Sequence, residues 1–292
     1  MTKRSSKAAE SILPVEDPSD ERESTTLSTS RTHIAMVAVF TVILAATEVV
    51  LAYYSAVLGA AIHAILVGGL LLQYVSAPSS NARLSGTGLP LALSSRLLPV
   101  VAQLSLLRLL SLVMPIEQIS EIYWYAMVGL PVLVGSVMTA RIIGFTRRDL
   151  GLTPKFGRPD IAIAASGIPL GLIGYLIARP DIEIDTDAWT TLILTSLFII
   201  VFSGFLEEFL FRGLLQNVAV REFGKFAIVW SSVIFGIMYL GSQSLQYALF
   251  MGGCGILFGW CYSRTLSLWS VVIAHALLSL GLLVVFPLIL NG

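Results

Sequence analysis

The chain has 292 residues, of which 56% are hydrophobic and only 12% are charged, and its mean hydropathy is +0.85. These values exclude an ordinary soluble domain and indicate an integral membrane protein. The formal net charge is zero, so the overall charge gives no reason to expect a nucleic-acid partner. The two cysteines, Cys254 and Cys261, are too few for a disulfide framework, and we expect them to pack as small apolar side chains.

Residues 1–32 are rich in Ser, Thr and mixed charge and contain few apolar side chains. Such a segment buries too little apolar surface to fold, so we expect a disordered cytosolic tail. Its basic start is not followed by a short apolar stretch with a small-residue cleavage site. We therefore do not interpret it as a cleaved signal peptide.

From Thr32 onward, apolar segments have lengths near the roughly 20 residues that cross a hydrocarbon core. The expected fold is all-α: a polytopic α-helical membrane protein with eight or nine transmembrane helices and no soluble domain. The number stays open because the sixth segment is long and the seventh is short. We group the segments into N-terminal transmembrane helices, residues 33–180, and a C-terminal helical core, residues 185–292. The nine candidate spans are 33–54, 57–75, 97–114, 122–143, 161–178, 189–216, 226–240, 246–263 and 267–290.

The placement of Lys and Arg predicts the orientation. With the N-terminus inside, fifteen of the eighteen basic residues fall in or next to inner loops, as expected for cytoplasmic segments. We therefore predict a cytosolic N-terminus and place the protein in the plasma membrane. The most basic loop, 144–160, is expected to set this orientation and to contact anionic lipid headgroups.

Ionisable side chains inside the first three spans have two interpretations. Glu48 and Arg108 are candidates for pairing with each other, and His63 is a candidate for a hydrogen bond between helices. A transport pathway uses the same kinds of residue, so a transporter remains an alternative function. The glycines of the G-x-x-x-G pattern, Gly255 and Gly259, are expected to permit close approach of two helices.

The segment SGFLEEFLFRGLLQ, residues 203–216, places two carboxylates and a guanidinium in an apolar span. Charges at membrane depth cost at least about 2.5 kcal/mol each, so they usually have partners and a function. Glu208 and Arg212 are four residues apart, on one helical face and in the favourable order, and can neutralise each other. Glu207 points about 100° away and is the carboxylate left free to react. The alternative is a buried ion triad that only fixes helix register.

Two later spans carry residue pairs with the same spacing of four, Phe235 with Tyr239 and His275 with Ser279. At a rise of about 1.5 Å per residue, Glu207 and His275 lie on the order of 12 to 15 Å from the inner ends of their spans, and Tyr239 about 20 Å. We therefore expect them to share one cavity that opens to the inner side. A lone membrane histidine is more often an interhelical hydrogen-bonding residue.

Taken in order, these three pairs of positions resemble the motifs of the CAAX prenyl protease and bacteriocin-processing family of intramembrane proteases, also called type II CPBP or Abi. Those motifs are E-E-x-x-x-R, F-x-x-x-H, and H-x-x-x-N or a similar small polar residue. The resemblance covers roughly residues 185–292. The first motif is intact in EEFLFRG, whereas Tyr239 replaces the second-motif histidine and Ser279 replaces the asparagine.

The resemblance implies an intramembrane endopeptidase that cleaves a membrane-associated protein or a lipidated, in some members prenylated, peptide. By the same resemblance Glu207 acts as general base on a water, Glu208 and Arg212 orient the site, and His275 binds the water or the oxyanion. A phenol donates hydrogen bonds but is a poor acid or base near pH 7, because its ordinary pKa is about 10. The residues expected to support the site or donate to the oxyanion are Phe235, Tyr239 and Ser279.

We expect no cofactor. Zinc bound by Glu207, Glu208 and His275 is a weak alternative, because Tyr239 removes the second histidine from the ligand set. The replaced motif residues also leave open a non-proteolytic family member that acts as a membrane scaffold or a bacteriocin self-immunity protein. Loss of function in Glu207→Gln favours the protease, and an indifferent Glu207→Gln with a sensitive Arg212→Ala favours the scaffold.

Overall fold

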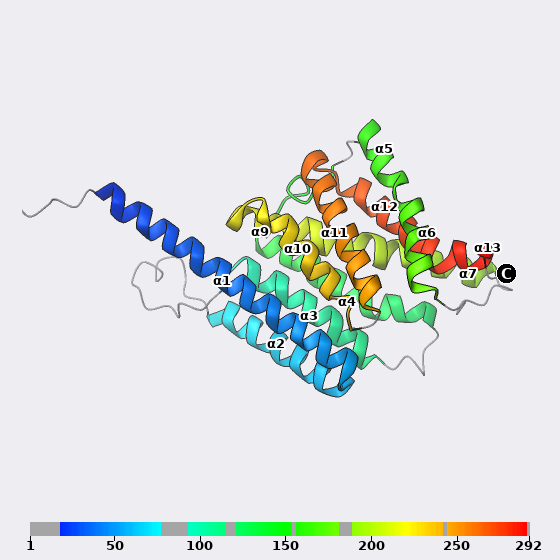
Figure 1. The fold of residues 1–292 in the computed structure, drawn as a ribbon, viewed down its shortest axis with the longest axis horizontal. Coiled ribbons are helices and arrows are strands. Elements are labelled where there is room, and N and C mark those ends of the chain that lie inside the picture. Colours follow the sequence, from blue (N-terminus) through cyan, green and yellow to red (C-terminus); the bar gives the residue numbers. More distant parts are fainter. Residues whose placement is uncertain are drawn as a thin grey trace, which may run out of the picture.

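The computed structural model describes residues 18–76, 93–114, 121–153, 156–180, 189–241 and 244–290. In these segments all regular secondary structure is helical, and the helices pack side by side with connections at both ends of the bundle (Figure 1). Seven helical stretches are long and apolar enough to cross a membrane. The predicted all-α, polytopic membrane fold is thus confirmed.

The helices follow the predicted spans closely. Two apolar helices, 97–113 and 226–237, are shorter than the seven long stretches and bring the total among the described residues to nine. The helix bounds are α1 Pro18–Tyr53, α2 Ala56–Ser76, α3 Leu97–Val113, α4 Glu121–Ile142, α5 Arg158–Ala165, α6 Gly167–Ala178, α7 Trp189–Phe198, α8 Leu206–Glu208, α9 Asn217–Phe223, α10 Phe226–Ile237, α11 Leu245–Thr265, α12 Leu268–Leu280 and α13 Phe286–Leu290. The π-helical segments Ile199–Phe205 and Phe209–Gln216 join α7, α8 and α9 into one long helix, and Gly281–Val285 joins α12 to α13.

Helix α1 begins earlier than its apolar span. Its backbone is helical from Pro18, whereas the sequence predicted a disordered tail through residue 32. Extending an existing helix avoids the cost of nucleation, so a polar segment attached to a stable span can continue it. The rest of the predicted tail, residues 1–17, lies outside the described residues.

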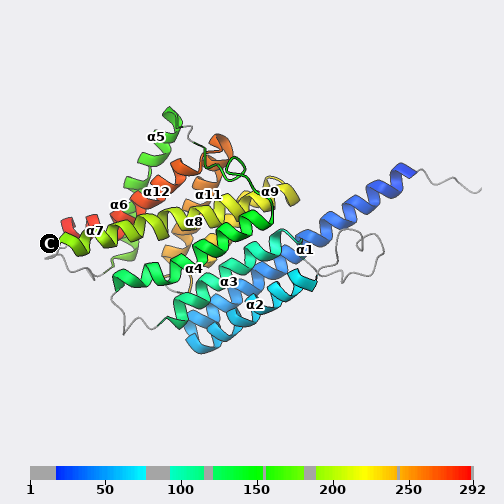
Figure 2. The same cartoon turned by 180° about the vertical axis from the view of Figure 1, so that it is seen from behind.

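The N-terminal helices form one side of the bundle. Helices α1, α2 and α3 pack together, with α2 and α3 in the most extensive contact. Viewed from behind, α4 lies between α3 and the long helix made of α7, α8 and α9 (Figure 2). Helices α5 and α6, which the sequence grouped with the N-terminal helices, instead pack on α12.

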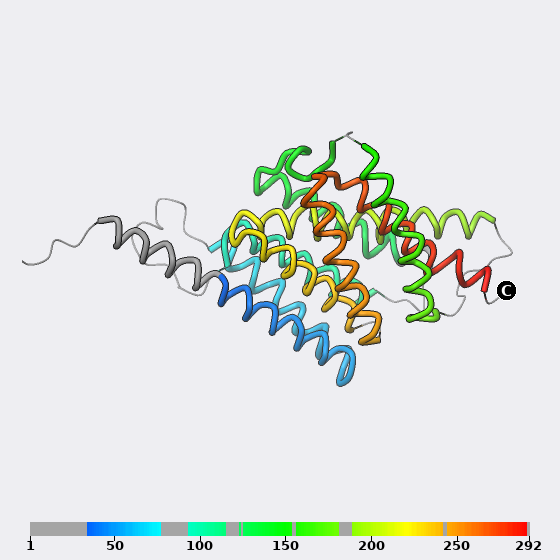
Figure 3. Tube along the Cα trace, turned by 45° about the horizontal axis from the view of Figure 1, so that its top comes forward, coloured from blue at the N-terminus to red at the C-terminus, as the bar shows by residue number. Residues whose placement is uncertain are grey.

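Close helix contacts depend on small residues at crossing points. A Cβ placed on Gly204 would lie 2.7 Å from the Cβ of Ala276 on α12, which is too close for two carbon atoms. The absence of that side chain lets α12 approach the long helix beside His275. Likewise, α10 and α11 are neighbours along their lengths (Figure 3), and a Cβ on Gly255 would lie 3.1 Å from the Cα of Ser232. The close approach predicted for the G-x-x-x-G pattern is confirmed.

The loop after α4 is anchored to the bundle through Asp149. Its carbonyl oxygen accepts a hydrogen bond from the side-chain amide of Asn217 (2.8 Å), and its carboxylate pairs with Arg221 (2.8 Å). The backbone N–H of Leu268 donates to the carbonyl of Gly151 (3.0 Å). This loop therefore fixes one end of the long helix and the start of α12, in addition to carrying the basic residues noted in the sequence.

Candidate active site

The paired glutamates lie on an unusual stretch of backbone. Glu207 and Glu208 belong to the single α-helical turn α8, which has a π-helical segment on each side. At the end of the first of these segments, the N–H of Leu206 donates to the carbonyl of Val201, five residues earlier. Such wider turns are rare in proteins, and those that do occur are frequently found at functional sites. No feature of the sequence predicted them.

Glu208 is the centre of a fully buried cluster. Its Oε1 accepts hydrogen bonds from Nη1 of Arg212 (2.8 Å), as predicted, and lies 2.8 Å from Nδ1 of His275. Nη2 of Arg212 donates to the carbonyl of Gly255 (3.2 Å), and the guanidinium carbon lies 4.5 Å from the ring centre of Phe235. The carboxylate, the guanidinium and the imidazole are thereby fixed relative to one another.

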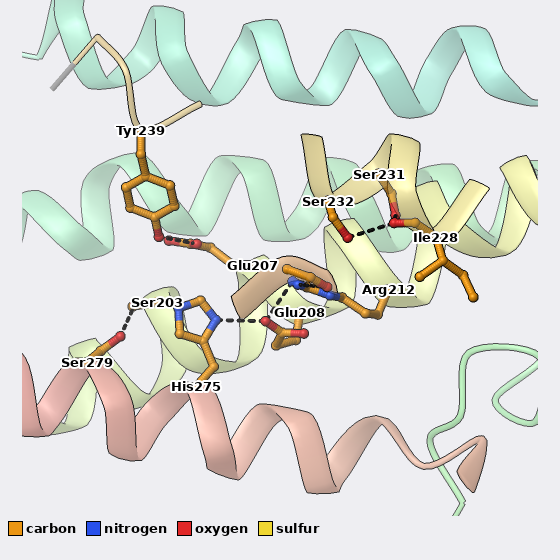
Figure 4. Close-up of polar contacts among 11 residues, drawn as sticks. Ser203, Glu207, Glu208, Arg212, Ile228, Ser231, Ser232, Tyr239, His275 and Ser279 are labelled. Atoms are coloured by element: carbon orange, nitrogen blue, oxygen red, sulfur yellow. Dashed lines mark hydrogen bonds and ion pairs between the residues drawn. The ribbon is translucent and has the colours of Figure 1, made fainter. Parts of the chain in front are cut away.

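Glu207 points the other way and has a different partner. Its Oε2 accepts a hydrogen bond from the phenol of Tyr239 (2.7 Å; Figure 4). The Tyr239 ring packs edge-on against Phe235, with 5.4 Å between ring centres. The tyrosine that replaces the second-motif histidine therefore still reaches the glutamate. In this structure it donates to the carboxylate, whereas we expected it to donate to an oxyanion.

A cavity of about 300 Å³ adjoins Glu207. Among the described residues that line it, Glu207 is the only carboxylate, and Tyr239 and Ser279 line it as well. The hydroxyl of Ser279 lies 2.8 Å from that of Ser203, which also faces the cavity (Figure 4). The remaining wall is largely apolar and includes Phe202, Leu206, Phe211, Leu282 and Leu283.

His275 does not line this cavity, contrary to the sequence prediction. Its side chain is fully buried, with Nδ1 held by Glu208 and the ring between Phe235 and Phe258, at 5.8 and 6.0 Å between ring centres. His275 of the third motif therefore contacts Glu208 of the first motif, whereas we expected it to share a cavity with Glu207. The buried cluster thus comprises Glu208, Arg212, His275 and Phe235, whereas Glu207, Tyr239 and Ser279 face the cavity.

The cavity also lies at the end of the bundle opposite to the one that the sequence predicted. The residues that line it come from helix ends far from the basic loop that follows α4. These are the start of α4 and α11, and the end of α3, α6 and α10. The depth calculation assumed that span six ends at residue 216, but the helix continues to Phe223. If the basic loop faces inward, the cavity therefore lies in the outer half of the bundle.

Comparison with protein families gives one match. Residues 189–281 match the family model described as type II CAAX prenyl endopeptidase, Rce1-like. We call these residues, which are similar to that family, the Rce1-like region. Comparison with curated proteins and with solved structures gives no match. The resemblance found in the motifs is confirmed over these residues, which include both glutamates and the replaced positions Tyr239 and Ser279.

Part of the cavity wall comes from helices that precede the Rce1-like region. Arg108 on α3 and Tyr125 on α4 line the cavity, and the sequence predicted neither as a site residue. The predicted pairing of Arg108 with Glu48 is confirmed, with Nε to Oε1 at 2.9 Å. Nε2 of His63 lies 3.4 Å from the same oxygen. Spacing along the chain gave no indication that this cluster reaches the cavity, because the contact depends on how separate helices pack against one another.

The zinc alternative requires Glu207, Glu208 and His275 to surround one ion. Nowhere in the described part of the chain are three His, Cys, Asp or Glu side chains arranged to hold a metal. The Oε1 of Glu208 is already shared by Arg212 and His275, and a guanidinium at a ligand oxygen opposes a metal cation there. These donors do not fit zinc.

Proposed function

We propose that the protein is an intramembrane endopeptidase in which Glu207 acts as general base, with no cofactor. One observation carries this proposal: Glu207 faces the cavity, while the adjacent Glu208 is neutralised by Arg212. The match of residues 189–281 to an endopeptidase family supports it. A carboxylate in a largely apolar cavity that is large enough for water and a peptide bond can perform this chemistry.

In the proposed reaction, Glu207 takes a proton from a water in the cavity while the water oxygen bonds to the substrate's carbonyl carbon. The carbonyl π electrons move to its oxygen, which becomes the oxyanion. The oxyanion then re-forms the carbonyl double bond while the carbon–nitrogen bond breaks, and the leaving nitrogen keeps the bonding pair and receives the proton from Glu207. Tyr239 orients the carboxylate through its hydrogen bond.

The oxyanion needs hydrogen-bond donors in the cavity. Ser203 and Ser279 contact each other there, and their mutual hydrogen bond uses only one of the two hydroxyl hydrogens. The second hydrogen is available to the oxyanion. His275 has no direct contact with the cavity and acts in this proposal by holding Glu208, and through it Arg212, in place.

The substrate is proposed to be a membrane-associated protein or a lipidated peptide, with membrane lipids around the bundle and no nucleic acid as a partner. A cytosolic N-terminus remains our proposal from the distribution of basic residues, and the plasma membrane remains our proposed location. In that orientation the cavity serves substrates presented from the outer half of the membrane. A prenylated cytosolic C-terminus would require the opposite orientation.

The test is a mass-spectrometric survey of new protein termini in membranes that contain equal amounts of wild type or Glu207→Gln. Glu222→Gln is the matched control, because Glu222 lies on the same long helix and does not line the cavity. We expect termini that vanish in Glu207→Gln and persist in the control, because loss of a general base costs about 10²- to 10⁴-fold. The membrane side on which these termini map tests the orientation.

The second candidate is a non-proteolytic membrane scaffold or self-immunity protein. The observation in its favour is that Tyr239 replaces the motif histidine and occupies one oxygen of Glu207. Identical terminus lists for wild type and Glu207→Gln, together with loss of the cellular phenotype in Arg212→Ala, would favour this function and refute the protease.

A further inference from the structure

Arg108 is a cation that lines the cavity, and it lies outside the residues that match the family model. It belongs to α3, is 7% exposed and lines the cavity with Glu207. Its Nε donates to Glu48, and its Nη2 donates to the backbone carbonyl of Met238. Met238 directly precedes Tyr239 in the chain. Arg108 therefore connects the N-terminal helices to the backbone that carries the partner of Glu207.

Carbonyls at the end of a helix lose their intrahelical donors, and no backbone N–H among the described residues donates to the carbonyl of Met238. Helix α10 ends at Ile237, and the following N–H groups, of Tyr239 and Leu240, donate to the carbonyls of Gly236 and Ile237, not to that of Met238. A guanidinium supplies a strong, fixed donor at this point. The hydrogen bond from Arg108 thus holds the turn from which the Tyr239 side chain extends toward Glu207.

Glu48 makes this arrangement possible. It is fully buried, and its pairing with Arg108 neutralises the guanidinium and fixes its orientation. Without that pairing, a positive charge in the same cavity would attract the carboxylate of Glu207. Glu48 therefore directs Arg108 toward the Met238 carbonyl and leaves Glu207 to its bond with Tyr239.

We propose that Arg108 is a positioning residue for the reaction, acting on Glu207 through the Met238 carbonyl and Tyr239. This inference rests on the proposed endopeptidase function. It assigns the N-terminal helices a role in the site, although they lie outside the Rce1-like match. The role is specific: Arg108 sets the orientation of the general base and does not itself contact the reacting atoms.

The test measures turnover by the full chain in vesicles, with membranes from Glu207→Gln cells as the substrate pool. The main variant is the pair Glu48→Gln with Arg108→Met, which removes the donor to Met238 without leaving a charge unpaired. Gln103→Met is the control, because Gln103 lies on α3 but is not among the described cavity residues. Arg108→Lys keeps the cation but lacks the planar fork that reaches both partners.

We expect the paired variant to lower the turnover number on the order of 10- to 100-fold, as small misplacements of a catalytic group do, at unchanged half-saturating substrate concentration. Arg108→Lys should fall between it and wild type, and Gln103→Met should match wild type. Because Arg108 acts through Tyr239, adding Tyr239→Phe to the paired variant should lower turnover by less than about twofold more. The paired variant and Tyr239→Phe should also shift the pH dependence of the turnover number in the same way.

Wild-type turnover in a folded paired variant, or losses that multiply when Tyr239→Phe is added, would overturn the positioning role and leave the proposed function intact. Should the paired variant not fold, Arg108→Lys decides in its place, and full activity there overturns the inference. Cleavage that persists in Glu207→Gln would refute the proposed function and this inference together.

Discussion

Two buried clusters in this protein are built from the same three residue types and differ in their surroundings. In the Rce1-like region, Oε1 of Glu208 lies 2.8 Å from both Arg212 and His275. In the N-terminal helices, Oε1 of Glu48 lies 2.9 Å from Arg108 and 3.4 Å from His63. Both carboxylates are fully buried. An acid, a guanidinium and an imidazole at membrane depth therefore do not by themselves define an active site.

The neighbours of each cluster make the difference. The first cluster is next to a second carboxylate, Glu207, which faces the cavity and has no guanidinium hydrogen-bonded to it among the described residues. Within the described segments the second cluster has no such extra acid, and its contribution to the cavity is the guanidinium of Arg108. In the proposed mechanism, neutralisation of one acid leaves a second acid free to react, which requires two adjacent acids. The E-E dipeptide is thus the informative part of the motif.

The largest effect that would test this comparison is expected for Arg212→Ala. The substitution leaves Glu208 buried with only His275 beside it and also removes the packing against Phe235. An uncompensated buried charge costs about 3 to 5 kcal/mol. We therefore expect a large fall in the free energy of unfolding, measured by denaturant titration in detergent. If Arg212→Ala is as stable as wild type, Glu208 is not held as an ion by Arg212.

A smaller loss is expected for Arg108→Ala, although it breaks the equivalent pair. Arg108 lines the cavity, so water can enter beside Glu48 once the side chain is removed. Compared by the same titration, Arg108→Ala should lose less stability than Arg212→Ala. The reverse order would show that solvent access does not distinguish the clusters.

Local spacing accounts for most of what the sequence could predict. Apolar segments of spanning length gave the helices, and the four-residue interval gave the Glu208–Arg212 pair, because both depend on the geometry of one helix. The side of the bundle that carries the cavity depends on where helices cross. That is determined by contacts such as Gly204 against Ala276, which no spacing rule encodes. The partner of His275 and the reach of Arg108 to Met238 follow from the same crossings.

The smallest effect is expected at a third acid–guanidinium pair, Asp149 with Arg221, which is partly exposed, the Arg221 side chain by 45% and that of Asp149 by 33%. Hydrogen bonds from the Thr146 side chain and backbone, together with Arg221, lower the pKa of Asp149 to about 2. Because the folded pKa lies below the ordinary value of about 4, the carboxylate contributes stability above pH 4. That contribution disappears as the pH falls from about 4 toward 2.

Asp149→Asn tests this contribution, because the amide oxygen can still accept a hydrogen bond from Thr146 while the charge beside Arg221 is removed. At pH 7 we expect the variant to be less stable than wild type by less than about 1 kcal/mol, as for other exposed ion pairs. The difference should shrink with added salt and vanish near pH 2. A loss as large as that of Arg212→Ala would contradict the view that burial, and not the pairing alone, determines how much these charges matter.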